Sequence, residues 1–337
     1  MTVPAPARLR AVLLAFLLVL AVAAPAGASA ARNKPKAKPS PNAGIVDIYT
    51  TLGFQNASAA GTGMIVTPGG EVLTNNHVVR GATTFKLVEV STRKTYTATV
   101  VGYSVSEDVA VLQIGGASGL KVVQRGNSSK LKVGQPVAAR GNAGGRGGVT
   151  IAKGTITALH RQIVASDDAG GSETLRNLIE TDAGIEPGDS GGPLMNAANR
   201  VIGMVTAGTT SFRFQGVATR GYAIPINRAM VILRQIEAGT SNELVHIGAT
   251  AFLGVSIQDV QGGVLVHDVV PGGAAEAAGL TAGSVITSLN GTPIVSSDDV
   301  RKVVLSLAPG VAVPIAWTDQ DGVAQAGTIT PASGPPQ

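Results

Sequence analysis

The amino-acid sequence predicts a mostly β fold. Short runs rich in Val, Ile and Thr alternate with turns rich in glycine and proline, and the 337 residues include 44 Gly and 18 Pro. Hydrophobic residues make up 44% of the chain and charged residues 14%, which is typical of a folded protein with a buried core. The length allows two or three domains. Because there is no cysteine, disulfides, iron–sulfur clusters and cysteine nucleophiles are excluded.

Residues 1–30 have the three-part layout of a secretory signal peptide. Arg8 and Arg10 form a basic start, residues 11–24 are an uncharged apolar run, and residues 28–30 (ASA) are a small-residue cleavage site. We expect cleavage after Ala30 and a secreted, extracytoplasmic protein. An uncleaved leader that anchors the chain to the cell envelope is the less favoured alternative, because a membrane-spanning helix needs roughly 20 apolar residues.

Residues 31–44 mix lysine with proline and have no apolar period, so we expect a flexible, solvated tail. The leader and this tail hold six of the 26 Lys and Arg residues and no acidic residue. From Ile45 onward, 20 basic residues therefore face 21 acidic ones. This near balance argues against a nucleic-acid partner, because a nucleic-acid-binding domain needs a basic patch on its folded surface.

Residues 45–240 are expected to form a first β domain. The turn Pro68-Gly69-Gly70 divides residues 62–74 into the two strands of a hairpin. Further β-branched runs lie at 96–101, 109–114, 149–159 and 201–207. Many short strands of this kind favour barrels or sandwiches over alternating β-α-β units.

One helix is expected at the end of this domain. Its apolar face has the i, i+3, i+4, i+7 spacing of a helix and consists of Ala229, Ile232, Leu233 and Ile236. Asn227 is the expected N-cap, and Gly239 is the expected stop. The polar stretch that follows marks a domain boundary.

Residues 246–332 are expected to form a second, smaller domain. Strands are predicted near 252–257 and 264–269, and a short helix at 274–278. Ser297 is the expected cap of a further helix. The apolar stripe of that helix is Val300, Val303, Val304 and Leu307.

Three short segments of the first domain carry a histidine, an aspartate and a serine in that order. TNNHVV (74–79) places His77 at the end of a strand, SEDVAVL (106–112) places Asp108 before an apolar strand, and GDSGGP (188–193) places Ser190 in a glycine-rich turn. Each segment alone is a weak signal, because a lone histidine or aspartate is usually structural. The order argues against an α/β-hydrolase, in which the serine comes first and the histidine last.

The combination matters because a serine hydroxyl is a poor nucleophile unless a base takes its proton. A neutral imidazole does this near pH 7, and a carboxylate holds the imidazole ring in the correct tautomer. The developing oxyanion needs backbone N–H donors. Gly188 suits that purpose, because glycine reaches backbone angles that other residues avoid.

These segments carry a family resemblance. TNNHVV, EDVAVLQI and TDAGIEPGDSGGPL resemble the catalytic segments of HtrA/DegP-type serine proteases, which have a trypsin-like fold. FLGV (252–255), followed by VVPGGAAEAAGLTAGSVITSLNG, resembles the PDZ domain that follows the protease domain in that family. The resemblance covers residues 45–330 and is closest to the secreted single-PDZ subgroup. It implies two six-stranded β-barrels with the active site between them, and then the PDZ domain.

The resemblance also implies roles for individual residues. His77 is the general base, Asp108 orients it, and Ser190 is the nucleophile, with the N–H groups of Gly188 and Ser190 as the oxyanion hole. Asp189 stands where many of these proteases have Asn. In digestive trypsin-like enzymes an Asp there pairs with a freshly cut N-terminus. This chain has no matching free Ile, so activation of that kind is not expected.

The residue that selects basic side chains in trypsin lies six positions before the serine, and here it is Gly184. Unless Asp182 turns inward, no carboxylate is available there. We therefore expect cleavage after small or medium apolar residues such as Val, Ala, Leu or Ile, with cleavage after Arg as the minority alternative. The expected substrate-binding residues are Gly184, Ile185, Thr206, Ala207 and Gly208.

PDZ domains add a bound peptide as an extra strand and capture its C-terminal carboxylate with backbone N–H groups. The expected peptide-binding residues are Phe252, Leu253, Gly254 and Val255. The stripe of the last predicted helix either faces this groove or belongs to the core. Core is favoured for Val303 and Leu307, and both interpretations stay open for Val300 and Val304.

Two functions of different classes fit the sequence. The first is a secreted, ATP-independent serine endopeptidase that degrades misfolded or unfolded proteins and is regulated by peptide C-termini at its PDZ domain. The second is a non-proteolytic chaperone or peptide-binding scaffold. The presence of all three site residues favours the first. A zinc hydrolase has little support from four scattered His and no HExxH motif. No metal or cofactor is expected, and the resemblance implies a homotrimer.

Overall fold

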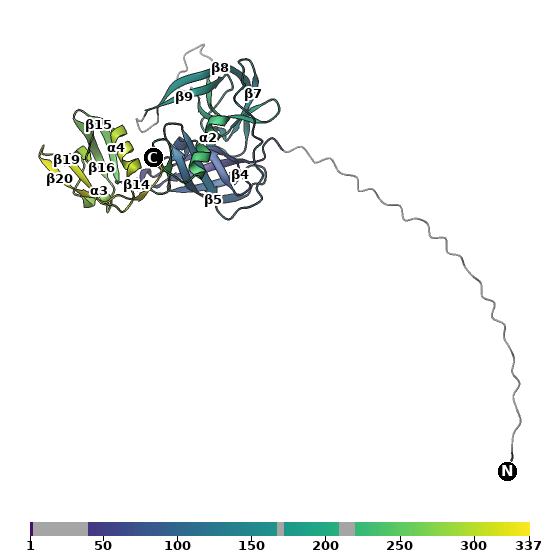
Figure 1. The fold of residues 1–337 in the computed structure, drawn as a ribbon, viewed down its shortest axis with the longest axis horizontal. Helices are drawn as coiled ribbons and strands as arrows, with labels where there is room; N and C mark the ends of the chain where they lie inside the picture. Colours follow the sequence, from purple (N-terminus) through teal and green to yellow (C-terminus); the bar gives the residue numbers. More distant parts are fainter. Residues whose placement is uncertain (3–39, 167–171, 209–219) are drawn as a thin grey trace. The chain divides into compact units, whose positions relative to one another are not determined.

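The computed structural model describes residues 1–2, 40–166, 172–208 and 220–337. Residues 3–30 of the predicted leader and residues 31–39 of the predicted tail lie outside the described residues. From Ser40 onward the described residues belong to one structural unit made mostly of β-strands (Figure 1). Within these described parts, no helix has both the length and the apolar character needed to cross a membrane.

The first six strands form a barrel. They are β1 (Ile45–Leu52), β2 (Ala57–Ile65), β3 (Glu71–Thr74), β4 (Thr84–Glu89), β5 (Thr95–Ser104) and β6 (Val109–Ile114). They follow the order β5-β4-β1-β2-β3-β6, and pairing of β5 with β6 closes the ring. The predicted hairpin at 62–74 is confirmed, because Met64 pairs with Leu73 across β2 and β3. A four-residue helix, α1 (Asn76–Val79), follows β3.

A second closed barrel follows along the chain. Its strands are β7 (Pro136–Gly141), β8 (Thr150–Ser166), β9 (Ser172–Thr181), β10 (Pro193–Asn196), β11 (Val201–Gly208) and β12 (Gly221–Pro225). They follow the order β10-β11-β12-β9-β8-β7, closed by the pairing of β10 with β7. Short 3₁₀ turns lie at Gly53–Gln55 and Ala143–Gly145.

Helix α2 (Ile226–Glu237) joins the two barrels through a shared hydrophobic cluster. Ile232 and Leu233 of this helix pack in one buried cluster with Met64 of the first barrel and Met204 of the second. The helix is labelled between the barrels in Figure 1. Burial of apolar surface in this cluster therefore fixes one barrel against the other, which is the condition for a site built from both.

The second domain is a small sheet with two helices. Its elements are β14 (Thr250–Phe252), β15 (Val255–Val260), β16 (Gly263–Val269), α3 (Ala274–Ala277), β17 (Val285–Leu289), β18 (Thr292–Pro293), α4 (Ser297–Ser306), β19 (Val313–Thr318), β20 (Ala324–Ile329) and β21 (Ala332–Gly334). The main path is β15-β16-β17-β19-β20, with β18 on β17. β14 pairs with β21 in a separate two-stranded sheet.

The structure corrects the predicted helix caps. Asn227 lies in the first turn of α2 rather than at its cap, and its side chain accepts a hydrogen bond from the Ser128 N–H at 3.4 Å. Ser296, not Ser297, caps α4 and forms a reciprocal capping box with Asp299. The stop at Gly239 is confirmed, with the residue at a φ of +73°.

Two predicted boundaries also differ. β13 (His246–Ile247) pairs with β5 of the first barrel, so these two residues extend the first sheet, and the elements of the second domain begin at Thr250. The predicted strand at 252–257 is divided between β14 and β15. Gly254 interrupts it with a φ of +77°, a conformation that a continuous strand does not contain.

Replacing Ile232 by alanine is expected to lower the free energy of unfolding by about 2–5 kcal/mol. The side chain is fully buried in the cluster that joins the barrels, so its loss leaves a cavity. Urea denaturation followed by circular dichroism measures the effect. The matched variant is Arg234→Ala on the exposed face of α2, which should change the stability by less than about 0.5 kcal/mol. Equal effects of the two substitutions would contradict this packing.

Candidate active site

Ser190 lies in a tight turn between β9 and β10 that only glycine can build. Gly188 has a φ of +98°, and a Cβ on it would lie 2.2 Å from the main-chain oxygen of Asn142. Gly191 has a φ of +84°, and a Cβ there would lie 2.0 Å from the main-chain oxygen of Thr62. Both distances are far below van der Waals contact. Glycine is therefore required at these positions for two reasons: the left-handed backbone angle, and the closeness of neighbouring main-chain atoms, which leaves no room for a Cβ.

Asp189, which precedes the serine, stabilises this turn through hydrogen bonds to its buried carboxylate. Its side chain is buried and accepts hydrogen bonds from the Glu186 N–H at 3.0 Å and the Thr150 hydroxyl at 3.3 Å. Burial raises the pKa of Asp189, and these two hydrogen bonds partly offset the effect. The contacts of the Asp189 carboxylate thus lie within its own loop and on β8.

His77 and Asp108 form a hydrogen-bonded pair on the first barrel. His77 lies on α1, with its side chain 37% exposed, and Asp108 directly precedes β6 and is 1% exposed. His77 Nδ1 lies 2.9 Å from Asp108 Oδ2, and the His77 main-chain N–H donates to Oδ1 at 3.0 Å. The strand-end position predicted for His77 is thus replaced by a short helix after the strand.

The carboxylate of Asp108 is held ionised by its partners. Burial alone would raise its pKa, but the charge of His77, its two hydrogen bonds and the Thr206 hydroxyl outweigh burial and lower the pKa of Asp108. The backbone is fixed as well. Asp108 has a φ of +50°, and its main-chain oxygen accepts from the Asn75 amide at 2.9 Å.

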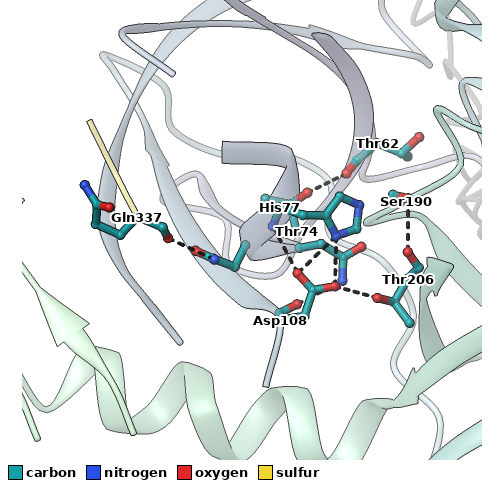
Figure 2. Close-up of polar contacts among 9 residues, drawn as sticks. Thr62, Thr74, His77, Asp108, Ser190, Thr206 and Gln337 are labelled. Atoms are coloured by element: carbon teal, nitrogen blue, oxygen red, sulfur yellow. Dashed lines mark hydrogen bonds and ion pairs between the residues drawn. The ribbon is translucent and has the colours of Figure 1, made fainter. Parts of the chain in front are cut away.

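Thr206 of β11 connects this pair to the serine. Its hydroxyl donates to Asp108 Oδ2, and its main-chain oxygen accepts from the Ser190 hydroxyl at 3.3 Å. Figure 2 shows Thr206 joined by dashed lines to both residues. The structure therefore brings the histidine, the aspartate and the serine to one place between the barrels, as the sequence predicts.

Thr62 of β2 ties the serine turn to the first barrel. Its N–H donates to the Ser190 main-chain oxygen at 2.8 Å, and its hydroxyl donates to the Gly188 main-chain oxygen at 2.7 Å. Thr74 in turn donates to the Thr62 main-chain oxygen at 2.7 Å (Figure 2). Sequence reasoning missed Asn75, Thr62 and Thr74. Asn75 and Thr74 stand close to the histidine in the sequence, but their partners lie 33 and 12 residues away, and the partner of the Thr62 hydroxyl lies 126 residues away.

The N–H groups of Gly188 and Ser190 stand in the turn that the resemblance assigns to an oxyanion hole. Neither group donates to an oxygen of the described residues, whereas the Asp189 N–H between them donates to Glu186 at 3.0 Å. Both donors are therefore available to a bound group. No cluster of three or more acidic or histidine side chains suited to a metal ion is found in the described parts of the chain.

The predicted substrate-binding residues fall into three groups. Gly184 is exposed, and a Cβ on it would meet nothing within 4 Å. Ile185 is 6% exposed, and its side chain packs in the core of the second barrel rather than in an open pocket. Ala207 and Gly208 pair with β12, beyond the point where β11 pairs with β10 at Met204.

The side chain of Asp182 settles one open alternative. Its carboxylate accepts hydrogen bonds from the main-chain N–H and the hydroxyl of Thr155, so it is turned toward β8. It does not supply the missing carboxylate next to Gly184. This arrangement removes the basis for the minority expectation of cleavage after Arg.

The expected peptide-binding residues of the second domain run from Phe252, the last residue of β14, to Val255, the first residue of β15. Leu253 is 4% exposed in the core, and its main-chain oxygen accepts from Ala275. Gly254 accepts from Val270, and Val255 begins the strand at the end of the main sheet path. Helix α4 carries the predicted stripe. All four stripe residues are buried in the core of this domain: Val300, Val303, Val304 and Leu307.

Comparisons with known proteins agree with this architecture. Residues 61–204 match the trypsin-like peptidase domain family, and residues 251–318 match the PDZ domain family. The serine protease PepD of Mycobacterium tuberculosis is 36% identical over 304 residues, which are 85% of this chain and 63% of that protein. A probable periplasmic serine endoprotease DegP-like of Pseudomonas savastanoi pv. phaseolicola is 35% identical over 289 residues, which are 82% of this chain and 56% of that protein.

The solved structure of the HtrA-type protease AlgW with a tripeptide superposes with a TM-score of 0.51 at 28% identity. The match covers 89% of this chain and 99% of that chain. The chain belongs to the HtrA/DegP-type serine proteases. The predicted trypsin-like fold followed by a PDZ domain is thereby confirmed. This HtrA/DegP-type chain spans about three fifths of the length of the curated relatives described above.

In this HtrA/DegP-type site, replacing Thr206 by valine is expected to lower kcat/KM by roughly 10- to 100-fold, because a hydrogen bond to a charged group contributes about 1.5–3 kcal/mol. Thr206→Ser keeps the hydroxyl and is the matched control. Peptide hydrolysis by the two variants measures the effect. A valine variant as active as the serine variant would show that the Thr206–Asp108 contact does not matter.

The same substitution changes the dependence of stability on pH. The pKa of Asp108 is lowered on folding, so its stabilising contribution is present above its ordinary pKa and is lost as pH falls through the lowered value. Without the Thr206 hydroxyl the pKa rises. The loss of stability on acidification should therefore be smaller in Thr206→Val than in Thr206→Ser and should be complete at a higher pH, as measured by the thermal unfolding midpoint from pH 7 to pH 3.

Proposed function

We propose that the chain is a serine endopeptidase in which Ser190 is the nucleophile and His77 is the general base. Asp108 orients the imidazole of His77 and stabilises its protonated form. The observation that carries this proposal is the bridge made by Thr206, which contacts both the Asp108 carboxylate and the Ser190 hydroxyl. Independent structural roles would give no reason for these side chains, from two barrels, to share a partner.

The chemistry follows from the geometry. Asp108 holds Nδ1 of His77, which leaves Nε2 as the ring nitrogen suited to accept a proton. The Ser190 hydroxyl turns from the Thr206 main-chain oxygen to this nitrogen when a substrate carbonyl is presented. As the serine oxygen bonds to the carbonyl carbon, its proton passes to His77, and the N–H groups of Gly188 and Ser190 stabilise the oxyanion. His77 then donates the proton to the leaving amine.

We propose unfolded or misfolded polypeptides as substrates. The backbone of β11 from Thr206 to Gly208 extends beyond its pairing with β10, which leaves an edge for an extended segment to join. Only a flexible or unfolded chain supplies such a segment. The open position at Gly184, together with Asp182 held by Thr155, favours small or medium apolar residues before the cleaved bond.

We further propose that the PDZ domain binds peptide C-termini along β15 and that this binding regulates the protease. β15 is the terminal strand of the main sheet path, so an added peptide strand finds a pairing partner there. The AlgW structure with a tripeptide supports peptide binding in a related chain.

An extracytoplasmic location is part of the proposal. It is supported by the relatives named as periplasmic and by the signal-peptide layout of residues 1–30. A homotrimer remains the assembly that the resemblance implies, and size-exclusion chromatography with light scattering tests it. The alternative of a non-proteolytic chaperone or scaffold is separated from the proposal by the reactivity of Ser190.

A fluorophosphonate probe is expected to label the wild-type chain and not Ser190→Ala, because the probe reacts with an activated serine. Cleavage of unfolded casein should fall by a factor on the order of 10⁶ in this variant. The matched control is Ser118→Ala, an exposed serine far along the chain, which should be labelled like the wild type. An unlabelled wild type that also leaves casein intact would favour the scaffold alternative.

Gly184→Asp is expected to move the preferred cleavage site toward Lys and Arg. The position is open, and a carboxylate there would face a basic side chain of the substrate. Mass spectrometry of casein fragments gives the residue before each cleaved bond. Gly184→Asn has the same shape without the charge and should keep the apolar preference. Identical fragments from both variants would place the specificity pocket elsewhere.

A further inference from the structure

The position of His77 depends on contacts from outside its own helix. Helix α1 has four residues, and a helix of one turn is not stable alone because nucleation is unfavourable. Its N-cap, Asn75, makes no side-chain capping bond and instead donates to the main-chain oxygen of Asp108. Val78 and Val79 anchor one face of α1 in the first barrel. The ends of the helical turn need other partners.

Those partners are supplied by residues 335–337, more than 250 residues further along the chain. The Asn76 side-chain amide donates to the main-chain oxygen of Gln337 at 3.0 Å (Figure 2). The Gly81 N–H, just after the helix, donates to the main-chain oxygen of Pro336 at 2.8 Å. Segment 335–337 therefore brackets the helical turn that carries His77. Asn76, Pro335 and Pro336 are buried, and Gln337 and Gly81 are half-buried, so these contacts are partly shielded from water.

The same segment is also held by a hydrogen bond to Tyr103 of β5. The Gln337 N–H donates to the Tyr103 hydroxyl at 3.2 Å, and this hydroxyl also contacts the Thr250 hydroxyl at 3.0 Å. Tyr103 is 1% exposed, and its backbone pairs with Ala110, two residues after Asp108. One buried phenol thus connects the segment to the strand that follows the aspartate.

The segment is continuous with the PDZ domain. Residues 335–337 follow β21 directly, and β21 pairs with β14, where Phe252 lies opposite Ala332. Phe252 is the first of the expected peptide-binding residues. A path of hydrogen-bonded backbone therefore runs from the start of the peptide-binding loop to the helix of the general base.

We propose that segment 335–337, together with Asn76 and Tyr103, is a positioning element that holds His77 in register with Asp108 and Ser190. The inference rests on the proposed serine protease function and deepens it. None of these residues touches the reacting atoms. They act on the orientation of the imidazole by fixing both ends of α1, and a displacement of about 1 Å in a catalytic group lowers the rate by roughly 100-fold.

Deleting residues 335–337 is expected to lower kcat by roughly 10- to 100-fold with KM within about twofold of the wild type. Substrate binding at β11 is left intact, so only the chemical step should suffer. Gln337→Ala is the matched variant, because the contacts use main-chain atoms of Gln337, and it should stay within about twofold of the wild-type kcat. A deletion variant with the kcat of the wild type would overturn the inference.

Asn76→Ala is a second variant, which leaves segment 335–337 in place. The substitution removes the amide that donates to the Gln337 oxygen and puts no charge into the buried site. It should lower kcat to a similar extent. Combined with the deletion, it should add little, because both changes remove the same contact. Fully multiplicative effects in the double variant, or an unchanged kcat in Asn76→Ala, would contradict the positioning role.

Hydrogen exchange separates failure of this inference from failure of the proposed function. If the wild type neither reacts with fluorophosphonate nor cleaves casein, the protease proposal fails, and kcat has no meaning. The amides of residues 76–81 are then compared between the wild type and the deletion variant by mass spectrometry. Faster exchange confined to these residues supports the positioning of α1 by the segment. Equal exchange overturns it.

Discussion

The buried carboxylate of Asp108 is the interaction on which the site depends. It sits at a left-handed φ of +50°, almost without exposure, and accepts hydrogen bonds from α1 of the first barrel and from Thr206 of the second. An unpaired charge at such depth would be strongly destabilising. The barrels therefore have to meet in one relative position to satisfy it. That position is also the one that brings Ser190 next to Thr206.

The turn around Ser190 obeys a second, steric constraint. Thr62 of the first barrel donates two hydrogen bonds to main-chain oxygens of this turn. The turn also passes so close to the main chain of Thr62 and Asn142 that no Cβ fits at Gly188 or Gly191. The glycines are thus needed for tertiary closeness as well as for local backbone angles. These hydrogen bonds come from the first barrel, which also carries His77. They therefore fix the position of the serine turn relative to the histidine.

The sequence was sufficient for the fold class and for gathering His77, Asp108 and Ser190, because periodicity, turn residues and short motifs are local signals. It was insufficient for Thr62, Thr74 and Asn75, whose roles depend on partners brought close only by folding. The burial of the Ile185 side chain could not be predicted for a related reason. It packs in a core cluster of the second barrel whose other members come from distant parts of the chain. Helix caps were shifted by one or two residues, where neighbouring polar residues compete for the same role.

Apolar packing and buried hydrogen bonds have different roles in this structure: the first mainly provides stability, and the second mainly fixes geometry. Burial of apolar side chains around α2 holds the barrels together but is non-directional, so it tolerates small shifts. Hydrogen bonds at Asp108, Thr62 and Asn76 are directional and leave little freedom in the placement of the imidazole and the serine turn. A site assembled from two barrels needs both. The cluster brings the halves within reach, and the buried polar contacts then select the one arrangement in which proton transfer from serine to histidine is geometrically possible.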